Sequence, residues 1–202
     1  MTFIPAGRLE NRAAELWRQH GLGPGFDAEA LLDRLELSLL WNELPADVLG
    51  ALKATESLVI LNQARLAHFD ATPGLRRFTL AHEIGHWLFH AEDARSGTLP
   101  MLEGGRTWCR EDADDKPRPP SEIQADLFAS YLLMPTDRLQ PLLPPAPWRG
   151  WPHVYRLAEQ FAVSATAMIV RLEKAGWAHR AEDGTPVGGR PPVAGQTTLP
   201  LA

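Results

Sequence analysis

Three histidines follow one another at four-residue intervals in the stretch FTLAHEIGHWLFH, which spans residues 78–90. In a helix, residues four apart lie about 6 Å apart along the axis and project from one face, so His82 and His86 can converge on one metal ion. Zinc held by imidazole nitrogens at about 2.0 to 2.1 Å needs such convergence. Glu83, beside the first histidine, can reach a water on the ion without ligating it. This His-Glu-x-x-His spacing predicts metal-assisted hydrolysis of a peptide bond, with Glu83 as the general base.

His90, the third histidine, cannot bind the same ion as His82 while the helix stays straight, because two helical turns separate them by about 12 Å. We therefore expect His90 to pack or to form hydrogen bonds. The motif also has a simpler interpretation, in which the histidines are half buried on the packing face of an amphipathic helix and hold no metal. The choice between these two interpretations depends on whether the chain supplies a third ligand, since a catalytic zinc takes three protein ligands and keeps an open position for water.

Acidic residues that could supply the third ligand follow the histidine stretch. Those before residue 116 lie at the end of the helix or in a polar segment, where a charge run ordinarily faces water. Glu122 and Asp126 differ, because they lie one turn apart on a predicted helix, where two like charges on the surface would repel each other. Glu122 could bind the metal while Asp126 accepts a hydrogen bond from a ligating histidine and fixes its tautomer. We favour Glu122 over the other candidates, which are Glu92, Asp93, Glu103, Glu111, Asp112, Asp114 and Asp115.

A small sheet beside helices is the expected scaffold. A helix predicted over residues 6–20 comes first, and Asp27 is placed to cap a short second helix. Three short apolar segments bounded by turn residues then indicate an α+β fold with a sheet of about three strands. The last of them could be an edge strand that receives an extended peptide, or a simple core strand. The segments are LSLLW at 37–41, DVLGALKA at 47–54 and SLVILN at 57–62.

Two longer helices are expected to carry the candidate ligands. Thr72 and Pro73 have the pattern of a helix start, and this helix would carry the histidines to about residue 91. Ser121 and Gln124 have the spacing of a capping box, which predicts a second helix that ends before Pro135. Small residues in the second helix, Ala125 and Ala129, would let the two helices approach closely.

A Pro-rich segment, PLLPPAPWRGWP, divides the chain. We expect a metallopeptidase domain over residues 1–140, a linker over 141–152, a small module like a helix-turn-helix over 153–180, and an extended Gly- and Pro-rich tail over 181–202. The second helix of the module offers only Arg171 and Lys174 as basic residues. Because phosphate binding needs more positive charge, this pattern argues against direct DNA binding.

The 202 residues carry a formal charge of −5 and a single cysteine, Cys109. An acidic chain is a poor match for coating nucleic acid or an anionic membrane. One cysteine cannot form an internal disulfide, so a reducing compartment, the cytoplasm, is expected. No apolar run reaches the roughly 18 residues of a membrane span. Two weaker hypotheses are a Cys109 thiolate that silences the metal, and His153 or Tyr155 as oxyanion or proton donors.

The sequences RRFTLAHEIGHWLFH and EIQADLFASYLLMP together resemble the ImmA/IrrE family of bacterial metallopeptidases. In that family, a helix with His-Glu-x-x-His is followed by a helix of the form E-x-x-A-N/D-x-F-A-x-x-L-L-M-P. The resemblance covers roughly residues 10–177 and implies a zincin-like domain. It implies that His82, His86 and Glu122 bind one zinc ion per chain. It also implies a catalytic Glu83 and an Asp126 that supports a ligand.

The chain differs from the family pattern in two respects. The segment between His86 and Glu122 is longer and more polar than the pattern suggests. No segment corresponds to the sensor-like C-terminal domain of the radiation-response branch, so the chain resembles the short branch.

Members of this family are typically intracellular proteases that cleave a helix-turn-helix repressor, often one encoded nearby, and so switch on mobile-element or stress genes. The main hypothesis is therefore a cytoplasmic zinc endopeptidase whose protein substrate is such a repressor. Manganese or iron could replace zinc, because two histidines and a carboxylate suit several divalent ions. The alternative is a non-proteolytic regulator that binds DNA or a protein partner and has a structural or vestigial metal site. Glu83 favours the enzyme, since a structural site would have a fourth protein ligand and no base.

Overall fold

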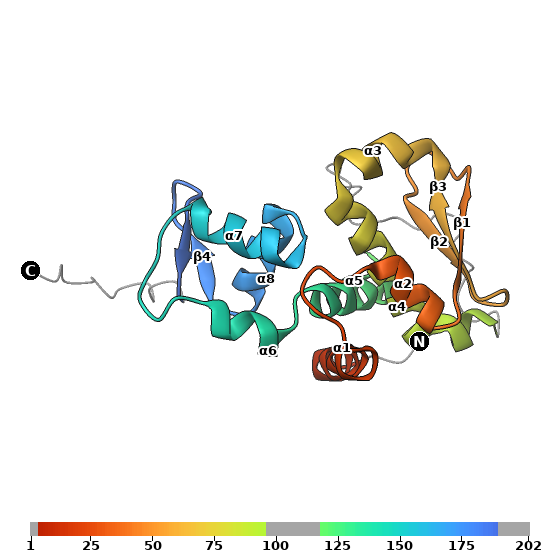
Figure 1. The fold of residues 1–202 in the computed structure, drawn as a ribbon, viewed down its shortest axis with the longest axis horizontal. Helices are drawn as coiled ribbons and strands as arrows, with labels where there is room; N and C mark the ends of the chain where they lie inside the picture. The colour runs from red at the N-terminus through yellow and green to blue at the C-terminus, as the bar shows by residue number, and fades with distance from the viewer. Residues whose placement is uncertain (1–3, 96–117, 190–202) are drawn as a thin grey trace, which may run out of the picture.

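The computed structural model describes residues 4–95 and 118–189, in which a small sheet lies at one end, a separate hairpin lies near the other, and helices pack between them (Figure 1). Among these residues, no helix is both long and apolar enough to cross a membrane. The helices are α1 (Ala6–His20), α2 (Ala28–Arg34), α3 (Leu66–Ala71), α4 (Pro73–Arg95), α5 (Pro120–Leu133), α6 (Thr136–Leu139), α7 (Trp151–Phe161) and α8 (Ala165–Lys174). The strands are β1 (Ser38–Asn42), β2 (Gly50–Lys53), β3 (Leu58–Asn62), β4 (Ala178–Arg180) and β5 (Pro186–Gly188). The predicted α+β class is confirmed.

β3 is the central strand of the three-stranded sheet, parallel to β1 and antiparallel to β2. Val59 and Leu61 of β3 are fully buried. An apolar run of this kind is typical of a strand that is covered on both faces. The prediction of about three strands is confirmed, but the interpretation of LVILN as an edge strand that receives a peptide is wrong. β1 and β2 form the edges.

Asn62, at the end of β3, fixes the chain that leads into β2. Its Nδ2 donates to the carbonyl oxygens of Leu44, Pro45 and Val48 at 3.2, 3.0 and 2.7 Å. Its Oδ1 accepts from the N–H of Leu44 at 3.2 Å. Asn62 is fully buried, and these bonds satisfy an amide that would otherwise be costly to bury. They fix the segment that leads into β2.

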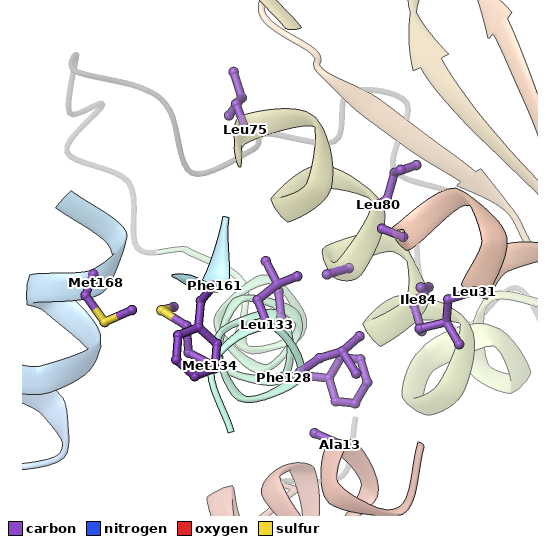
Figure 2. Packing of buried hydrophobic residues seen from close by; sticks show 14 of the residues in the cluster. Ala13, Leu31, Leu75, Leu80, Ile84, Phe128, Leu133, Met134, Phe161 and Met168 are labelled. Carbon is purple, nitrogen blue, oxygen red and sulfur yellow. The ribbon is translucent and has the colours of Figure 1, made fainter. Parts of the chain in front are cut away.

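α4 and α5 pack closely because small residues face each other where the helices meet. A Cβ atom on Gly85 would lie 3.0 Å from Cδ1 of Phe128 and 3.2 Å from Cα of Ala125. Ala125 and Ala129 are fully buried, which confirms the close approach predicted for these two alanines. Figure 2 shows Phe128 of α5 and Ile84 of α4 in the same buried cluster.

The start of α5 differs from the prediction. The helix begins at Pro120, after Pro119 as N-cap, and it has no side-chain cap. The capping box predicted at Ser121 and Gln124 is therefore wrong, since both residues lie inside the helix and are buried. Proline in the first turn explains the earlier start, because its fixed φ suits a helix and its missing N–H needs no partner there.

Other helix boundaries agree better with the sequence. Oδ1 of Asp27 caps α2 by accepting from the backbone N–H of Glu29 at 2.9 Å and of Ala30 at 3.4 Å. α1 spans the predicted residues. α4 begins at Pro73 as predicted and continues to Arg95, beyond the expected end.

The two helices predicted near the C-terminus are α7 and α8. α7 ends where Ala162 adopts a left-handed φ of 50°, and Oγ of Ser164 caps α8 by accepting from the N–H of Ala167 at 3.0 Å. Phe161 and Met168 lie in the same buried cluster as the end of α5 (Figure 2). The helices thus share a core with the rest of the chain, and the domain boundaries predicted for them remain a proposal.

Arg171 of α8 ties the C-terminal helices to the end of α5. Its Nε donates to the carbonyl of Met134 at 3.1 Å, and its Nη2 donates to Oγ1 of Thr136 at 2.7 Å. The guanidinium lies 4.9 Å from the ring centroid of Tyr131, a cation–π contact. At 4% exposure, Arg171 is committed to these contacts and is not available to DNA phosphates.

β4 and β5 form an antiparallel hairpin that was not expected from the sequence. Its turn contains Asp183, whose Oδ1 accepts from the N–H of Thr185 at 2.9 Å, and Gly184, whose φ is 76°. Asp-Gly flanked by strands is a strong hairpin signal. The Gly- and Pro-rich composition around it favoured an extended tail instead. Residues 181–189 therefore complete a hairpin where an extended tail was expected, and residues 190–202 lie outside the described part.

Candidate metal centre

Three side chains from α4 and α5 converge on one point. The Nε2 atoms of His82 and His86 lie 3.0 Å apart. Oε2 of Glu122 lies 3.3 Å from Nε2 of His82, and Oε1 lies 3.2 Å from Nε2 of His86. All three side chains are buried. The histidines converge because they are one turn apart on α4, and Glu122 meets them because Gly85 and Ala125 allow α5 to approach.

This donor set suits a small divalent cation. A tetrahedral zinc with ligands at about 2.0 to 2.1 Å separates neighbouring donor atoms by about 3.3 to 3.4 Å. The separations here are 3.0 to 3.3 Å. Both carboxylate oxygens of Glu122 are buried, and each lies 3.2 to 3.3 Å from a histidine Nε2 without hydrogen-bond geometry among the described residues. A buried carboxylate in this position needs a positive charge beside it, which a protonated histidine or a bound cation supplies, so the residues fit a metal ion.

Glu122 is the third donor that the described part of the chain supplies. The other acidic candidates and Cys109 fall where the structure describes no side chains. These are Glu92, Asp93, Glu103, Cys109, Glu111, Asp112, Asp114 and Asp115.

The charges in the cluster are strongly coupled. Burial lowers the pKa of His82, but contacts with Asp126 and Glu122 outweigh burial and raise this pKa to about 10. Burial lowers the pKa of His86 below its ordinary value. Burial raises the pKa of Glu122, yet the two histidines beside it hold the pKa well below the usual carboxyl range. Without a cation, the cluster therefore keeps a proton on His82 near neutral pH.

Asp126 orients His82. Nδ1 of His82 lies 2.9 Å from Oδ1 of Asp126, and a histidine that offers Nε2 to a metal carries its proton on Nδ1. Nη2 of Arg118 donates to Oδ2 of Asp126 at 2.5 Å, which neutralises the buried carboxylate. Sequence reasoning missed Arg118, because it precedes α5 and shares no helical spacing with Asp126.

Glu83 is buried between α4 and the edge strand β2. Burial raises its pKa to about 7, while the charge of His82 lowers the pKa and that of Glu122 raises it. A Cβ atom on Gly50 would lie 3.5 Å from Oε1 of Glu83 and 2.7 Å from Cγ2 of Thr79. Only glycine therefore lets β2 approach α4 this closely. Sequence reasoning missed Gly50, although a glycine inside a strand pattern can signal a close approach of the backbone.

His90 lies behind the three donors rather than among them. Its Nδ1 is 3.1 Å from Nδ1 of His86, and its Nε2 is 2.9 Å from Oε1 of Gln124. The expected hydrogen-bonding role of His90 is confirmed. The same hydrogen bond gives the buried amide oxygen of Gln124 a partner.

His153 and Tyr155, considered as oxyanion or proton donors, lie on α7 and make other contacts. Nδ1 of His153 is 2.7 Å from Nη2 of Arg156, and its ring centroid lies 4.8 Å from that of Trp148. Tyr155 is 56% exposed and stacks on Trp151. α7 lies across α5 from the three-stranded sheet (Figure 1). The structure does not bring either residue to the donor cluster.

Comparisons with a protein family and with solved structures each found a match. The peptidase family described as the IrrE N-terminal-like domain matches residues 68–173, which include α5 and the histidine-bearing part of α4. Among solved structures, a Mycobacterium tuberculosis transcriptional regulator has a similar fold, with a TM-score of 0.52 and 17% sequence identity. The match covers 83% of this chain and 46% of that one, so the chain spans less than half of that protein. No curated protein matches. This chain belongs to the IrrE N-terminal-like peptidase family and has its zincin-like α+β fold.

Proposed function

We propose that the protein is a metal-dependent endopeptidase in which His82, His86 and Glu122 hold one zinc ion. The observation that carries the proposal is the convergence of three buried donor atoms, with the buried Glu83 close enough to interact electrostatically with His82 and Glu122. Three protein ligands leave one position for water, as catalytic rather than structural zinc sites do. Manganese or iron would suit the same ligands, so the metal content of the purified protein decides which ion is native.

Glu83 is the proposed general base and acid. A bound zinc ion would act as a Lewis acid that makes a water molecule more acidic and polarises the scissile carbonyl. Burial raises the pKa of Glu83 to about 7, which matches proton exchange near neutral pH, although a cation beside it lowers this value again. Glu83 takes a proton from the attacking water and passes it to the leaving amine. Asp126 keeps His82 in its ligating tautomer throughout.

The substrate is proposed to lie along β2. Gly50 of β2 is paired with Leu61 of β3. Next to this pair, Leu49 and Asn62 form a hydrogen-bonded pair, in which the N–H of Asn62 donates to the carbonyl of Leu49. In an antiparallel ladder such pairs alternate, so the N–H and C=O of Gly50 point away from β3. An extended peptide that adds to this edge would pass beside Glu83. Pairing along β2 would therefore place a peptide bond at the proposed base.

The proposed substrate is a helix-turn-helix repressor in the cytoplasm, where the single cysteine of the chain would stay reduced. The family resemblance supports this substrate class. The alternative, a non-proteolytic regulator with a structural metal site, draws on the fold likeness to a protein named a transcriptional regulator. The burial of Arg171 argues against a regulator that binds DNA through α8.

The test compares wild type with Glu83→Gln, using Glu56→Gln as an exposed control. Each full-length protein is analysed for metal and then incubated with the repressor encoded nearest its gene. We expect wild type and Glu56→Gln to bind one zinc per chain and to cleave the repressor at one site, in a reaction that a chelator stops. Glu83→Gln should keep the zinc and lose roughly 10²- to 10⁴-fold in rate. Cleavage by Glu83→Gln at the wild-type rate would exclude this mechanism. Bound zinc without any cleavage would favour the regulator.

A further inference from the structure

A hydrogen-bonded chain of side chains stands behind His86, one of the proposed ligands. It runs from Nδ1 of His86 to Nδ1 of His90 at 3.1 Å, and from Nε2 of His90 to Oε1 of Gln124 at 2.9 Å. The three residues are 7%, 3% and 5% exposed, so water has little access to the bonds between them. The chain links α4 to α5, as the contact between His82 and Asp126 also does.

The direction of each bond follows from the role of His86. A histidine that offers the lone pair of Nε2 to a metal must carry its proton on Nδ1. This Nδ1–H can donate only if His90 presents a bare Nδ1, which puts the proton of His90 on Nε2. The N–H at Nε2 of His90 then needs an acceptor, and Oε1 of Gln124 is placed to accept. All three groups thus agree with one assignment of protons.

We propose that His90 and Gln124 are positioning residues that hold His86 in the tautomer and orientation that present Nε2 to the metal. The inference rests on the proposed metal site. It also explains the even spacing of the three histidines, because His90 is one turn beyond His86 on the same face of α4.

The two ligating histidines are therefore supported in different ways. Nδ1 of His82 faces the carboxylate of Asp126, whereas Nδ1 of His86 faces the imidazole of His90.

The first experiment measures the tautomers directly. Long-range ¹H–¹⁵N correlation spectra of the zinc-loaded wild-type protein, labelled with ¹⁵N at histidine, distinguish Nδ1–H from Nε2–H. Spectra of His90→Asn assign the His90 signals. We expect Nδ1–H for His86 and Nε2–H for His90. A zinc-loaded protein in which His90 carries its proton on Nδ1, or on both nitrogens, would overturn the proposal.

The second experiment measures zinc affinity by competition with a chelator. His90→Phe and Gln124→Met remove the acceptors while they keep similar volume, and each should raise the Kd for zinc by about 10- to 100-fold. His90→Asn should recover most of the loss, because its amide oxygen can take the place of Nδ1. The controls are His20→Phe and Gln160→Met, which change the same residue types away from the site and should leave the Kd unchanged.

The outcomes separate this inference from the proposed function. A folded His90→Phe protein with the wild-type Kd overturns this inference and leaves the peptidase proposal intact. A wild-type protein that does not bind zinc overturns both. If His90→Phe does not fold, the tautomers of the wild-type protein decide the matter.

Discussion

Nδ1 of His82 lies 2.9 Å from Oδ1 of Asp126, although 44 positions of sequence separate the two residues. The contact crosses from α4 to α5, so the helix that carries the proposed ligand Glu122 also determines which nitrogen of His82 points toward the donor cluster. The centre therefore depends on the packing of α4 against α5 as much as on its three donors.

Replacing Asp126 should separate its role as an acceptor from its charge. Asp126→Asn keeps an oxygen that can accept from Nδ1 of His82, and we expect its zinc affinity to stay within a few-fold of wild type. Asp126→Leu removes the acceptor and leaves Arg118 without its carboxylate, so the Kd for zinc should rise by about 10- to 100-fold. Asp137→Leu, at an exposed carboxylate of α6, is the control. Equal affinities for all three variants would show that the contact does not support the metal.

Zinc binding should tighten as the pH rises from 6.5 to 8.5. In the metal-free protein the pKa of His82 is raised to about 10, so His82 is protonated over this whole range. His86 has a lowered pKa and is mostly neutral there. Because a ligating His82 must be neutral, each zinc displaces its proton, and affinity should increase by up to about tenfold per pH unit. Calorimetry in buffers of different ionisation enthalpy counts the protons released. A Kd that is independent of pH would contradict the raised pKa of His82.

The close contact between α4 and α5 predicts a cost for any side chain at position 85. A Cβ atom there would meet Cδ1 of Phe128 at 3.0 Å and the backbone of Ala125 at 3.2 Å. Gly85→Ala should therefore lower the free energy of unfolding by about 1 to 3 kcal/mol, and zinc affinity should fall as Glu122 moves away from the histidines. The control is Gly7→Ala in α1, where a Cβ atom meets nothing within 4 Å. Urea denaturation of both variants with a chelator present makes the comparison, and equal stabilities would refute the packing argument.

Much of the centre follows from sequence because its determinants are local. The spacing of His82 and His86 predicts their convergence once the segment is helical. The like charges of Glu122 and Asp126, one turn apart, predict that a positive group lies beside them. Gly50 and Arg118 could not be identified in this way, because their roles depend on which strand and which extended segment the fold brings beside α4 and α5. The capping box at Ser121 failed for a related reason, since burial of Gln124 against His90 is a tertiary effect that local propensity does not contain.

Gly50 is expected to support catalysis without contributing to metal binding. Gly50→Ala would place Cβ 2.7 Å from Cγ2 of Thr79, and Thr79 is buried, with its Oγ1 donating to the carbonyl of Leu75 at 3.0 Å. Because Thr79 cannot easily turn aside, β2 must shift away from α4 and from Glu83.

None of the three donor atoms contacts Gly50, so zinc affinity should stay within a few-fold of wild type. A shift of about 1 Å in the strand proposed to hold the substrate should lower kcat/KM by about 10²-fold. Thr79→Ser removes the obstructing methyl group, and it should have little effect alone but restore much of the activity when combined with Gly50→Ala. Measuring kcat/KM and the zinc Kd for all four proteins makes the test. If the double variant is as slow as Gly50→Ala, the loss does not arise from this contact, and the proposed placement of substrate along β2 loses its support.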